Sequence, residues 1–324
     1  MPFDSELPTN KVLSRKSVSI LSPLRYPGSK RRLASYIMQT LQLNHLQPRL
    51  FVEPFAGGAS VALQLLQEGL VEGIGLIERD PLVAAFWKVV FSKDAQWLID
   101  QVATIPVTLE QWKIYKKTIP TDLKERALAC LFLNRTSFSG IMTPKVGPIG
   151  GKSQLSAYPI DCRFPRQTLI KRILQAQSLR DRVLFVWNIH WKKGLQLITS
   201  MQSRESLPRD IFYYLDPPFI NKADQLYTYW FRRQDHQDLC NYTSQMKDKW
   251  LLSYDVDSYV LELYEHHHQS CVELLYSTSS GAGSKSVREI IITNLPYLPS
   301  ATRLWQTSHE RKIAREIIRT KNHH

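Results

Sequence analysis

The sequence predicts an α/β fold built on a mainly parallel, doubly wound sheet with one late antiparallel strand. Between residues 49 and 80 a short apolar strand, a glycine turn, a helix and a second strand follow one another, as at the start of such a sheet. Later strand-like segments are separated in several places by helix-like stretches. The last two have only SSGAGSKSV between them, which predicts a hairpin and therefore an antiparallel pair.

The elements are expected in the following order. RRLASYIMQTLQL (31–43) carries apolar residues near helical spacing and predicts an amphipathic helix. RLFVEPF (49–55) predicts a buried strand, the segment 59–70 a helix, and VEGIGLIERD (71–80) the next strand. The later strands are expected in RVLFVWN (182–188), IFYYLDPPF (211–219), KWLLSYD (249–255), CVELLYS (271–277) and REIIITN (288–294).

Residues 89–181 interrupt this strand–helix rhythm. They contain the helical stretch LKERALACLFLNR (123–135) and then a loop rich in glycine, proline and lysine. The segment is too long for an ordinary connection, so we interpret it as an inserted, mostly helical second domain. The expected organisation is a loose arm at 1–20, a main domain formed by 21–88 and 182–300, the insertion, and a basic C-terminal helix or tail at 301–324.

The charge and the composition of the chain indicate which classes of partner and cofactor to expect. The chain has 42 Lys and Arg against 29 Asp and Glu, a net charge of +13. This charge suits a polyanionic partner and leaves nucleic acid and an anionic membrane surface both open. No apolar run approaches the roughly 18–20 residues that span a bilayer, and the N-terminus lacks a secretory signal, so we expect a cytoplasmic protein. The cysteines show no CxxC spacing and His266–His268 has no further ligands nearby in sequence, so we expect no metal.

A glycine turn and a later acid indicate a cofactor. Gly57 and Gly58 lie between a strand and a helix, where glycine permits a tight turn and the close approach of a ligand. Glu78 ends the next strand, where a carboxylate can accept hydrogen bonds from both hydroxyls of a ribose. An adenosine-containing cofactor is therefore expected. Ala56 and Ser60 do not supply the G-x-G-x-x-G pattern, which disfavours NAD.

The strand 211–219 ends in Asp216, Pro217, Pro218 and Phe219. The prolines donate no N–H and restrict φ, so they stiffen the turn and leave the carbonyl of Pro217 as an acceptor. This carbonyl and the Asp216 carboxylate suit a planar amino group, and Phe219 offers a face on which a planar base can stack. A rigid turn with a solvated aspartate is the simpler alternative, but it explains less of the combination with Glu78.

Five segments then suggest a family. They are LRYPGSK (24–30), FVEPFAGGAS (51–60), LNRTSFSG (133–140), LDPPF (215–219) and SVREIIITN (286–294). In this order they resemble the DNA adenine-N6 methyltransferases of the DNA adenine methylase type, the alpha group, over roughly residues 20–295. The resemblance implies a Rossmann-like S-adenosylmethionine-dependent methyltransferase sheet, a target-recognition domain at 89–181, and S-adenosyl-L-methionine as cofactor without a metal.

The resemblance also implies roles for single residues. Tyr26 and Lys30 would fold over the methionine end of the cofactor, Glu78 would hold its ribose and Asn188 its adenine. The cofactor-binding set is Tyr26, Lys30, Glu53, Phe55, Gly57, Gly58, Glu78, Asn188 and Asp216, and the catalytic set is Asp216, Pro217, Pro218 and Phe219. Phe219 stands where tyrosine is commoner and Glu78 where aspartate is common, but stacking and hydrogen-bond acceptance survive both changes.

The implied reaction is site-specific transfer of a methyl group to the N6 amino group of adenine in double-stranded DNA. The adenine would be flipped out of the duplex and would stack on Phe219. Asp216 and the carbonyl of Pro217 would accept the amino hydrogens, and the methyl group would move by direct in-line displacement. The aromatic run at 227–231 fits either the pocket entrance or the core.

DNA contacts are expected at Asn134, Arg135, Lys145, Lys152, Lys285 and Arg288, with Arg163, Arg166, Lys171 and Arg172 as further phosphate contacts. We expect a monomer, no membrane partner, and a separately encoded restriction endonuclease as a candidate partner. The alternatives are methyl transfer to RNA adenine, cytosine N4 or a protein amide, a non-catalytic nucleic-acid-binding protein, and a NAD-dependent oxidoreductase.

Overall fold

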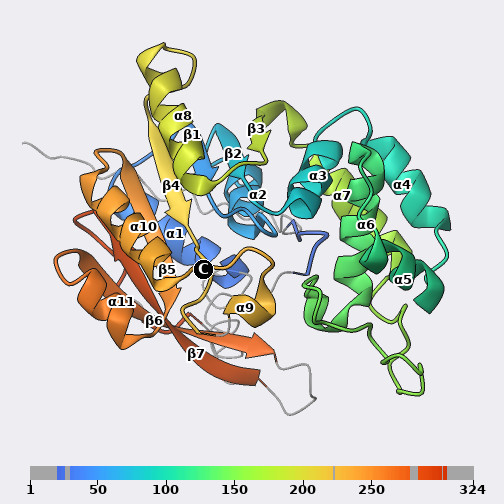
Figure 1. Ribbon diagram of the computed structural model, residues 1–324. Coiled ribbons are helices and arrows are strands. Elements are labelled where there is room, and N and C mark those ends of the chain that lie inside the picture. Colours follow the sequence, from blue (N-terminus) through green and yellow to red (C-terminus); the bar gives the residue numbers. More distant parts are fainter. Residues whose placement is uncertain (1–19, 26–29, 222, 278–283, 301, 305–324) are drawn as a thin grey trace, which may run out of the picture.

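The computed structural model describes residues 20–25, 30–221, 223–277, 284–300 and 302–304. Within these residues seven strands form one sheet in the order β3-β2-β1-β4-β5-β7-β6 (Figure 1). The strands are β1 (Leu50–Glu53), β2 (Gly73–Ile77), β3 (Val183–Trp187), β4 (Ile211–Leu215), β5 (Lys249–Asp255), β6 (His268–Ser277) and β7 (Ser284–Thr293). Among these strands β7 alone runs opposite to the other six, so it pairs antiparallel with both β5 and β6. The predicted Rossmann-like sheet with one late antiparallel strand is therefore confirmed.

Helices cover both faces of the sheet, because successive side chains of a strand point to opposite sides. Phe51 of β1 lies in the core that one group of helices covers, and the next residue, Val52, lies in the core of the other face. The first group is α1 (Ala34–Leu43), α2 (Ser60–Gln67) and α3 (Pro81–Val90). The second is α8 (Trp191–Ser203), α10 (Arg233–Gln245) and α11 (Ser258–Leu263).

The inserted segment is mostly helical, and Figure 1 shows its helices gathered to one side of the sheet. They are α4 (Ala95–Thr104), α5 (Leu109–Lys117), α6 (Leu123–Thr136) and α7 (Arg166–Gln177), with the short 3-10 turns η2 (Phe138–Gly140) and η3 (Arg180–Arg182). Helix α6 packs along α3, and buried residues of all four helices belong to the same hydrophobic cluster as α1 to α3. The insertion therefore shares a continuous core with the main domain, and the division into two domains stays a prediction.

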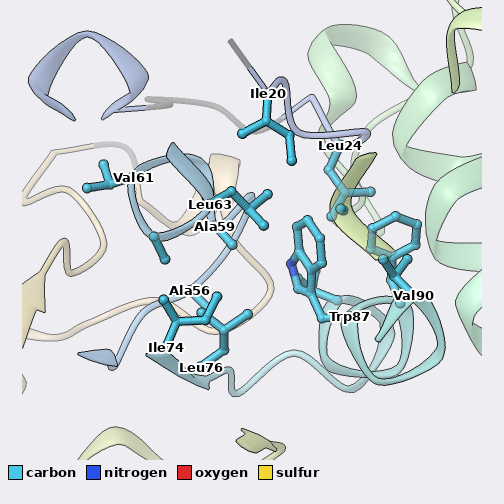
Figure 2. Packing of buried hydrophobic residues seen from close by; sticks show 14 of the residues in the cluster. Ile20, Leu24, Ala56, Ala59, Val61, Leu63, Ile74, Leu76, Trp87 and Val90 are labelled. Atoms are coloured by element: carbon cyan, nitrogen blue, oxygen red, sulfur yellow. The ribbon is translucent and has the colours of Figure 1, made fainter. Parts of the chain in front are cut away.

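Trp87 of α3 connects this core to the turn after β1. Its side chain is fully buried and stacks on Phe91 at 5.5 Å between ring centroids. Figure 2 shows Trp87 with Leu24 and Leu63 packed close by. The indole Nε1 donates to the carbonyl oxygen of Gly57 at 2.8 Å. Apolar packing in the core thus fixes the position of a backbone turn whose other side faces a cavity.

Most predicted elements are found within a few residues of their expected bounds. The helix expected at 31–43 begins with a 3-10 turn, η1 (Lys30–Leu33), before α1. The strand expected at 211–219 ends earlier, at Leu215, because Pro217 and Pro218 have no N–H to donate to a neighbouring strand. Two further elements are the short α9 (Ala223–Leu226) and an isolated pairing of Arg303 with Glu273 of β6. Over the described part of the chain, no helix combines the length and apolar character needed to cross a bilayer.

Gly75 in β2 offers a test of how tightly the sheet edge is packed. It pairs with Phe185 of β3, whose ring stacks on Trp187 at 3.8 Å between centroids. A Cβ at Gly75 would lie 2.2 Å from Cζ of Phe185. We expect Gly75→Ala to lower the free energy of unfolding by about 1–3 kcal/mol, because the stacked ring must move. Urea unfolding followed by circular dichroism would measure this.

Gly73→Ala is the matched control in the same strand. A Cβ at Gly73 would meet Cδ1 of Leu184 at 2.4 Å, but that atom is the end of a flexible and exposed side chain. We expect the control to cost less than about 1 kcal/mol. Equal costs for the two variants would contradict the proposed role of the Phe185 ring.

Candidate active site

A cavity opens where β1, β2 and β4 end. Ligands of parallel sheets bind outside the carboxyl ends of the strands, and the register brings these ends level, since Phe51 pairs with both Ile74 and Phe212. The cavity has a volume of about 1110 Å³, counted together with the solvent in its mouth. It is lined by residues 53–61, 78–80, 140–142 and 226–229 and by Lys30, Trp191, Tyr214, Asp216, Pro218 and Phe231.

The turn after β1 is centred on Gly57, whose φ of +44° lies in the left-handed region that glycine adopts readily. The N–H of Gly57 donates to Oε2 of Glu78, and its carbonyl accepts from Trp87, both at 2.8 Å. Glu53 holds the following helix, because its Oε1 accepts from the N–H of Ala62 at 2.8 Å, in the first turn of α2. Side chains from three elements therefore fix this turn against the cavity.

Glu78 lies directly after β2 with 7% of its surface exposed. Its Oε1 accepts from the N–H of Asp80 and its Oε2 from the N–H of Gly57, both at 2.8 Å. Each carboxylate oxygen has a second lone pair, so the side chain can accept two further hydrogen bonds from a ligand. Burial raises the pKa of Glu78 to about 7, and the charge of Asp80 adds to the shift while the backbone N–H groups oppose it.

Asp216 follows β4 and is the acid closest to a buried cation. Its Oδ1 lies 3.0 Å from Nζ of Lys30 and accepts from Oγ of Ser253 at 3.2 Å. The hydroxyl of Tyr214 lies 2.9 Å from the same Ser253 Oγ. The side chain of Asp216 is 26% exposed, so a ligand can still reach the carboxylate. Burial raises the pKa of Asp216, and the ammonium of Lys30 opposes this shift.

Glu289 of β7 is the second acidic partner of Lys30. Its Oε1 lies 3.3 Å from Nζ of Lys30, and the two side chains are 3% and 2% exposed. An uncompensated charge at such depth would cost several kcal/mol or more, so each of these groups depends on the other. The ion pair connects the start of η1 with β7, and through Asp216 with the end of β4.

Two groups of aromatic rings lie at the cavity. Phe55, Trp191 and Phe231 all line it, and the ring of Phe55 lies 5.6 Å from that of Phe231 and 6.2 Å from that of Trp191. Tyr227 also lines it and meets the ring of Phe219 nearly edge-on at 5.9 Å, and Nζ of Lys30 lies 5.0 Å from the centroid of the Phe219 ring. The lining therefore offers apolar surface for a planar ligand beside charged groups.

The structure brings most of the expected cofactor residues to one cavity. Lys30, Glu53, Phe55, Gly57, Gly58, Glu78 and Asp216 line it, as does Pro218 from the catalytic set. Pro217 is buried and Phe219 half-buried, and neither forms part of the lining. Asn188 instead donates to the carbonyls of Glu78 and Arg79, at 2.9 and 3.1 Å, and so supports the end of β2. Tyr26 lies outside the described residues.

Two of the expected DNA contacts require a correction. Asn134 is fully buried and Arg135 is 5% exposed. Asn134 bonds to the backbone of Arg25 and Gly140, and Arg135 donates to the carbonyl of Pro23. These side chains are committed to backbone groups inside the protein, so the expectation that they contact DNA is wrong for this structure. The sequence alone does not predict this burial, because Asn and Arg are usually exposed.

The other basic residues divide into two groups. Lys145 and Lys152 on the insertion and Arg288 on β7 are exposed, as are Arg163 and Lys171, and the side chain of Lys285 lies outside the described part of the chain. Arg166 donates to the carbonyls of Val102 and Ile105, and Arg172 to that of Ser22. The second group is therefore engaged with backbone carbonyls, whereas the first is exposed, although Lys145 also lies 3.6 Å from the carboxylate of Asp224.

Sequence reasoning missed Glu289 and Ser253. Both lie in strands, and their partners are far away in sequence: Glu289 contacts Lys30, and Ser253 contacts Asp216. A signal for Glu289 was present, because a lone acid opens the apolar run Ile290–Ile292 in the middle of a strand. A charged residue in such a run is rarely buried without a partner, so it predicts a paired charge.

Three comparisons with known proteins were informative to different degrees, and one of them shows a family. A family model described as D12 class N6 adenine-specific DNA methyltransferase matches residues 26–278. A comparison with curated proteins finds no match. Among solved structures, the precorrin-6y C5,15-methyltransferase from Geobacter metallireducens GS-15 is 11% identical with a TM-score of 0.37, over 83% of this chain and 91% of that one. Among the described residues, no three His, Cys, Asp or Glu side chains are grouped so as to hold a metal ion.

Glu53 yields a prediction on pH. Burial raises its pKa to about 8, with the charge of Asp216 adding to the shift and the N–H of Ala62 opposing it. Between the unfolded pKa near 4.5 and the folded pKa, the native state binds the proton more tightly than the unfolded state. Stability from this group therefore falls as the pH rises through that window, by roughly 1.4 kcal/mol per pKa unit at most.

Glu53→Gln keeps the acceptor for Ala62 and removes the titration. We expect the free energy of unfolding of this variant, relative to the original protein, to increase from about pH 5 to pH 8 and then to level off. Chemical denaturation at four pH values would measure it. Parallel curves for the two proteins would mean that Glu53 is already ionised in the native state at neutral pH.

Proposed function

The chain belongs to the D12 class N6 adenine-specific DNA methyltransferase family, and on that premise we propose a specific reaction. The protein transfers the methyl group of S-adenosylmethionine to the N6 amino group of an adenine flipped out of double-stranded DNA. The observation that carries the proposal is the position of Asp216. Its carboxylate is partly exposed, lies 3.0 Å from a buried ammonium, and lines the same cavity as Glu78 and the Gly57 turn.

Membership in this family implies the use of S-adenosylmethionine, and the residues of the cavity fit that cofactor. Glu78 would hold the ribose hydroxyls, since both of its oxygens are fixed by backbone N–H groups and still have acceptor capacity. Phe55, Trp191 and Phe231, which line the cavity, would contact the adenine of the cofactor. When bound, the cofactor supplies an electrophilic methyl group on a sulfonium, whose sulfur leaves as a neutral thioether.

Asp216 would orient the target amino group. The described contacts of its carboxylate fall on Oδ1, which leaves Oδ2 to accept a hydrogen from the N6 amino group. The carbonyl of Pro217 is the proposed second acceptor, so that the nitrogen lone pair points away from both. So oriented, the N6 nitrogen would be able to attack the methyl group that the cofactor supplies, with the thioether as the leaving group. The surplus proton on N6 leaves to Asp216 and from there to water.

Lys30 and Glu289 would keep this carboxylate in place and in its ionised form. The ammonium opposes the increase in the pKa of Asp216 that burial causes. Glu289 in turn holds Lys30, because it is the deeper of the two acids. The same lysine and Tyr227 fix the plane of the Phe219 ring, which is the proposed stacking surface for the flipped base. Positioning and a preset electrostatic field would supply most of the rate enhancement.

DNA would reach the cavity across the exposed basic residues. The proposed phosphate contacts are Lys145, Lys152, Arg163, Lys171, Lys285 and Arg288. Support comes from their charge and, for all but Lys285, from the exposure of their side chains on the insertion and on β7. A monomeric state and a separately encoded restriction endonuclease stay predictions.

Methyl transfer from radiolabelled S-adenosylmethionine tests the proposal. We expect label in unmethylated genomic DNA, recovered as N6-methyladenine after digestion to nucleosides. We expect Asp216→Ala and Asp216→Asn to lower turnover by about 10²–10³-fold, because Ala removes the acceptor of the amino group and Asn removes the negative charge of the carboxylate. RNA is the parallel substrate, and label in RNA but not in DNA would reject DNA as the substrate.

Two controls separate chemistry from folding. Asp181→Ala removes an aspartate that is 88% exposed on η3, away from the cavity lining, and should retain normal turnover. Thermal unfolding should show Asp216→Asn to be folded at the assay temperature. A folded Asp216→Asn protein with near-normal turnover would overturn the assignment of Asp216.

A further inference from the structure

Asn134 makes three hydrogen bonds at the end of α6, although it is fully buried. Its Oδ1 accepts from the N–H of Arg25 at 2.7 Å, and its Nδ2 donates to the carbonyls of Arg25 at 2.7 Å and Gly140 at 3.0 Å. A side-chain amide carries a donor beside an acceptor, so it pairs with Arg25 as a neighbouring peptide group would. If the side-chain amide were flipped, its NH2 group would face the N–H of Arg25, and its oxygen would face the carbonyls of Arg25 and Gly140.

The two segments that Asn134 joins also touch each other. Gly140 has a φ of +77°, and a Cβ there would lie 2.6 Å from the carbonyl oxygen of Arg25. A side chain at position 140 would therefore collide with backbone and would also be strained. Gly140 and the two residues after it line the cavity. Asn134 thus spans the junction between a cavity wall and the segment that leads to Lys30.

Neighbouring side chains of the insertion hold the same two segments. Arg135 donates from Nε to the carbonyl of Pro23 at 2.8 Å, and Arg172 of α7 donates to that of Ser22 at 3.3 Å. On the wall, Nζ of Lys116 donates to the carbonyls of Met142 and Thr143 at 3.2 and 2.5 Å. The insertion therefore holds the backbone at residues 22–25 and at the cavity wall beside Met142.

We propose that Asn134 is a positioning residue that couples the helical insertion to the active site. It sets the backbone of Arg25, five positions before Lys30, against the cavity wall at Gly140. A displacement of the insertion would therefore move the backbone of Arg25 and the cavity wall at Gly140 together. The predicted effect on turnover rests on the proposed methyl transfer. The predicted effect on the backbone rests only on the three hydrogen bonds of Asn134.

Asn134→Asp is the decisive variant because it keeps the shape and the acceptor for Arg25 but turns an anionic oxygen toward two carbonyls. We expect faster amide exchange in peptides covering 20–25 and 137–143. We expect turnover to fall by about 10²-fold, as for a small displacement of reacting groups, with the KM for DNA changed less than about threefold. The ratio of Asn134→Asp to original turnover should increase at acidic pH, where the protonated carboxyl can donate to one carbonyl, and Asn134→Ala should show no such increase.

Leu128→Ala is the control for a general loss of stability, since Leu128 is buried in the same helix and lacks these contacts. It should lower the unfolding midpoint and leave turnover unchanged where the protein is folded. Normal turnover and normal exchange in Asn134→Asp would overturn the inference, and so would an equal loss in Leu128→Ala. If the original protein methylates no nucleic acid, the proposed function fails. Amide exchange and calorimetric binding of S-adenosylhomocysteine then decide the coupling alone, and unchanged values would overturn it.

Discussion

The architecture of the site depends on one buried ammonium. Lys30 is 2% exposed and lies within 3.3 Å of carboxylates on two different strands, Asp216 after β4 and Glu289 in β7. Removing a charge from water is costly unless partners replace the solvent, so the three groups must assemble together or not at all. This requirement brings the segment before α1, the end of β4 and the antiparallel strand β7 to one point. It also explains why the ammonium of Lys30 opposes the increase in the pKa of Asp216 that burial causes.

The second constraint comes from the backbone around the glycine turn. Glu78 accepts the N–H of Gly57, Trp87 donates to its carbonyl, and Glu53 caps the helix that follows. These three hydrogen bonds hold the backbone of the turn, so its conformation does not depend on a bound ligand. A site of this kind gains affinity because little order has to be created on binding. The arrangement has an energetic cost, because it buries the carboxyl groups of Glu53 and Glu78. Their burial raises the pKa of both groups.

The sequence was sufficient to predict the sheet and the residues at the ends of its strands. Hydrophobic runs and the Gly57 turn mark the early strands, and the short link before β7 marks the antiparallel pair. Glu78 and Asp216 follow strands directly, so local pattern places them at the sheet edge. Local sequence patterns do not predict side-chain contacts between segments that are far apart in the chain. Asn134 meets Arg25 109 positions away, and the composition of α6 does not distinguish a polar side chain facing solvent from one facing a carbonyl.

This difference changes how the charge of the chain should be understood. The net charge of +13 includes basic groups that bond to acids or carbonyls within the protein, among them Lys30, Lys116, Arg135, Arg166 and Arg172. The last four come from the insertion, and three of these, Lys116, Arg135 and Arg172, bond to backbone that borders the cavity or precedes Lys30 in sequence. The basic residues of the insertion therefore fall into two kinds: some hydrogen-bond to backbone at or near the site, and others lie exposed on the surface. Phosphate contacts are to be tested first among the exposed cations, because a side chain held by backbone carbonyls is not available to replace counterions on DNA.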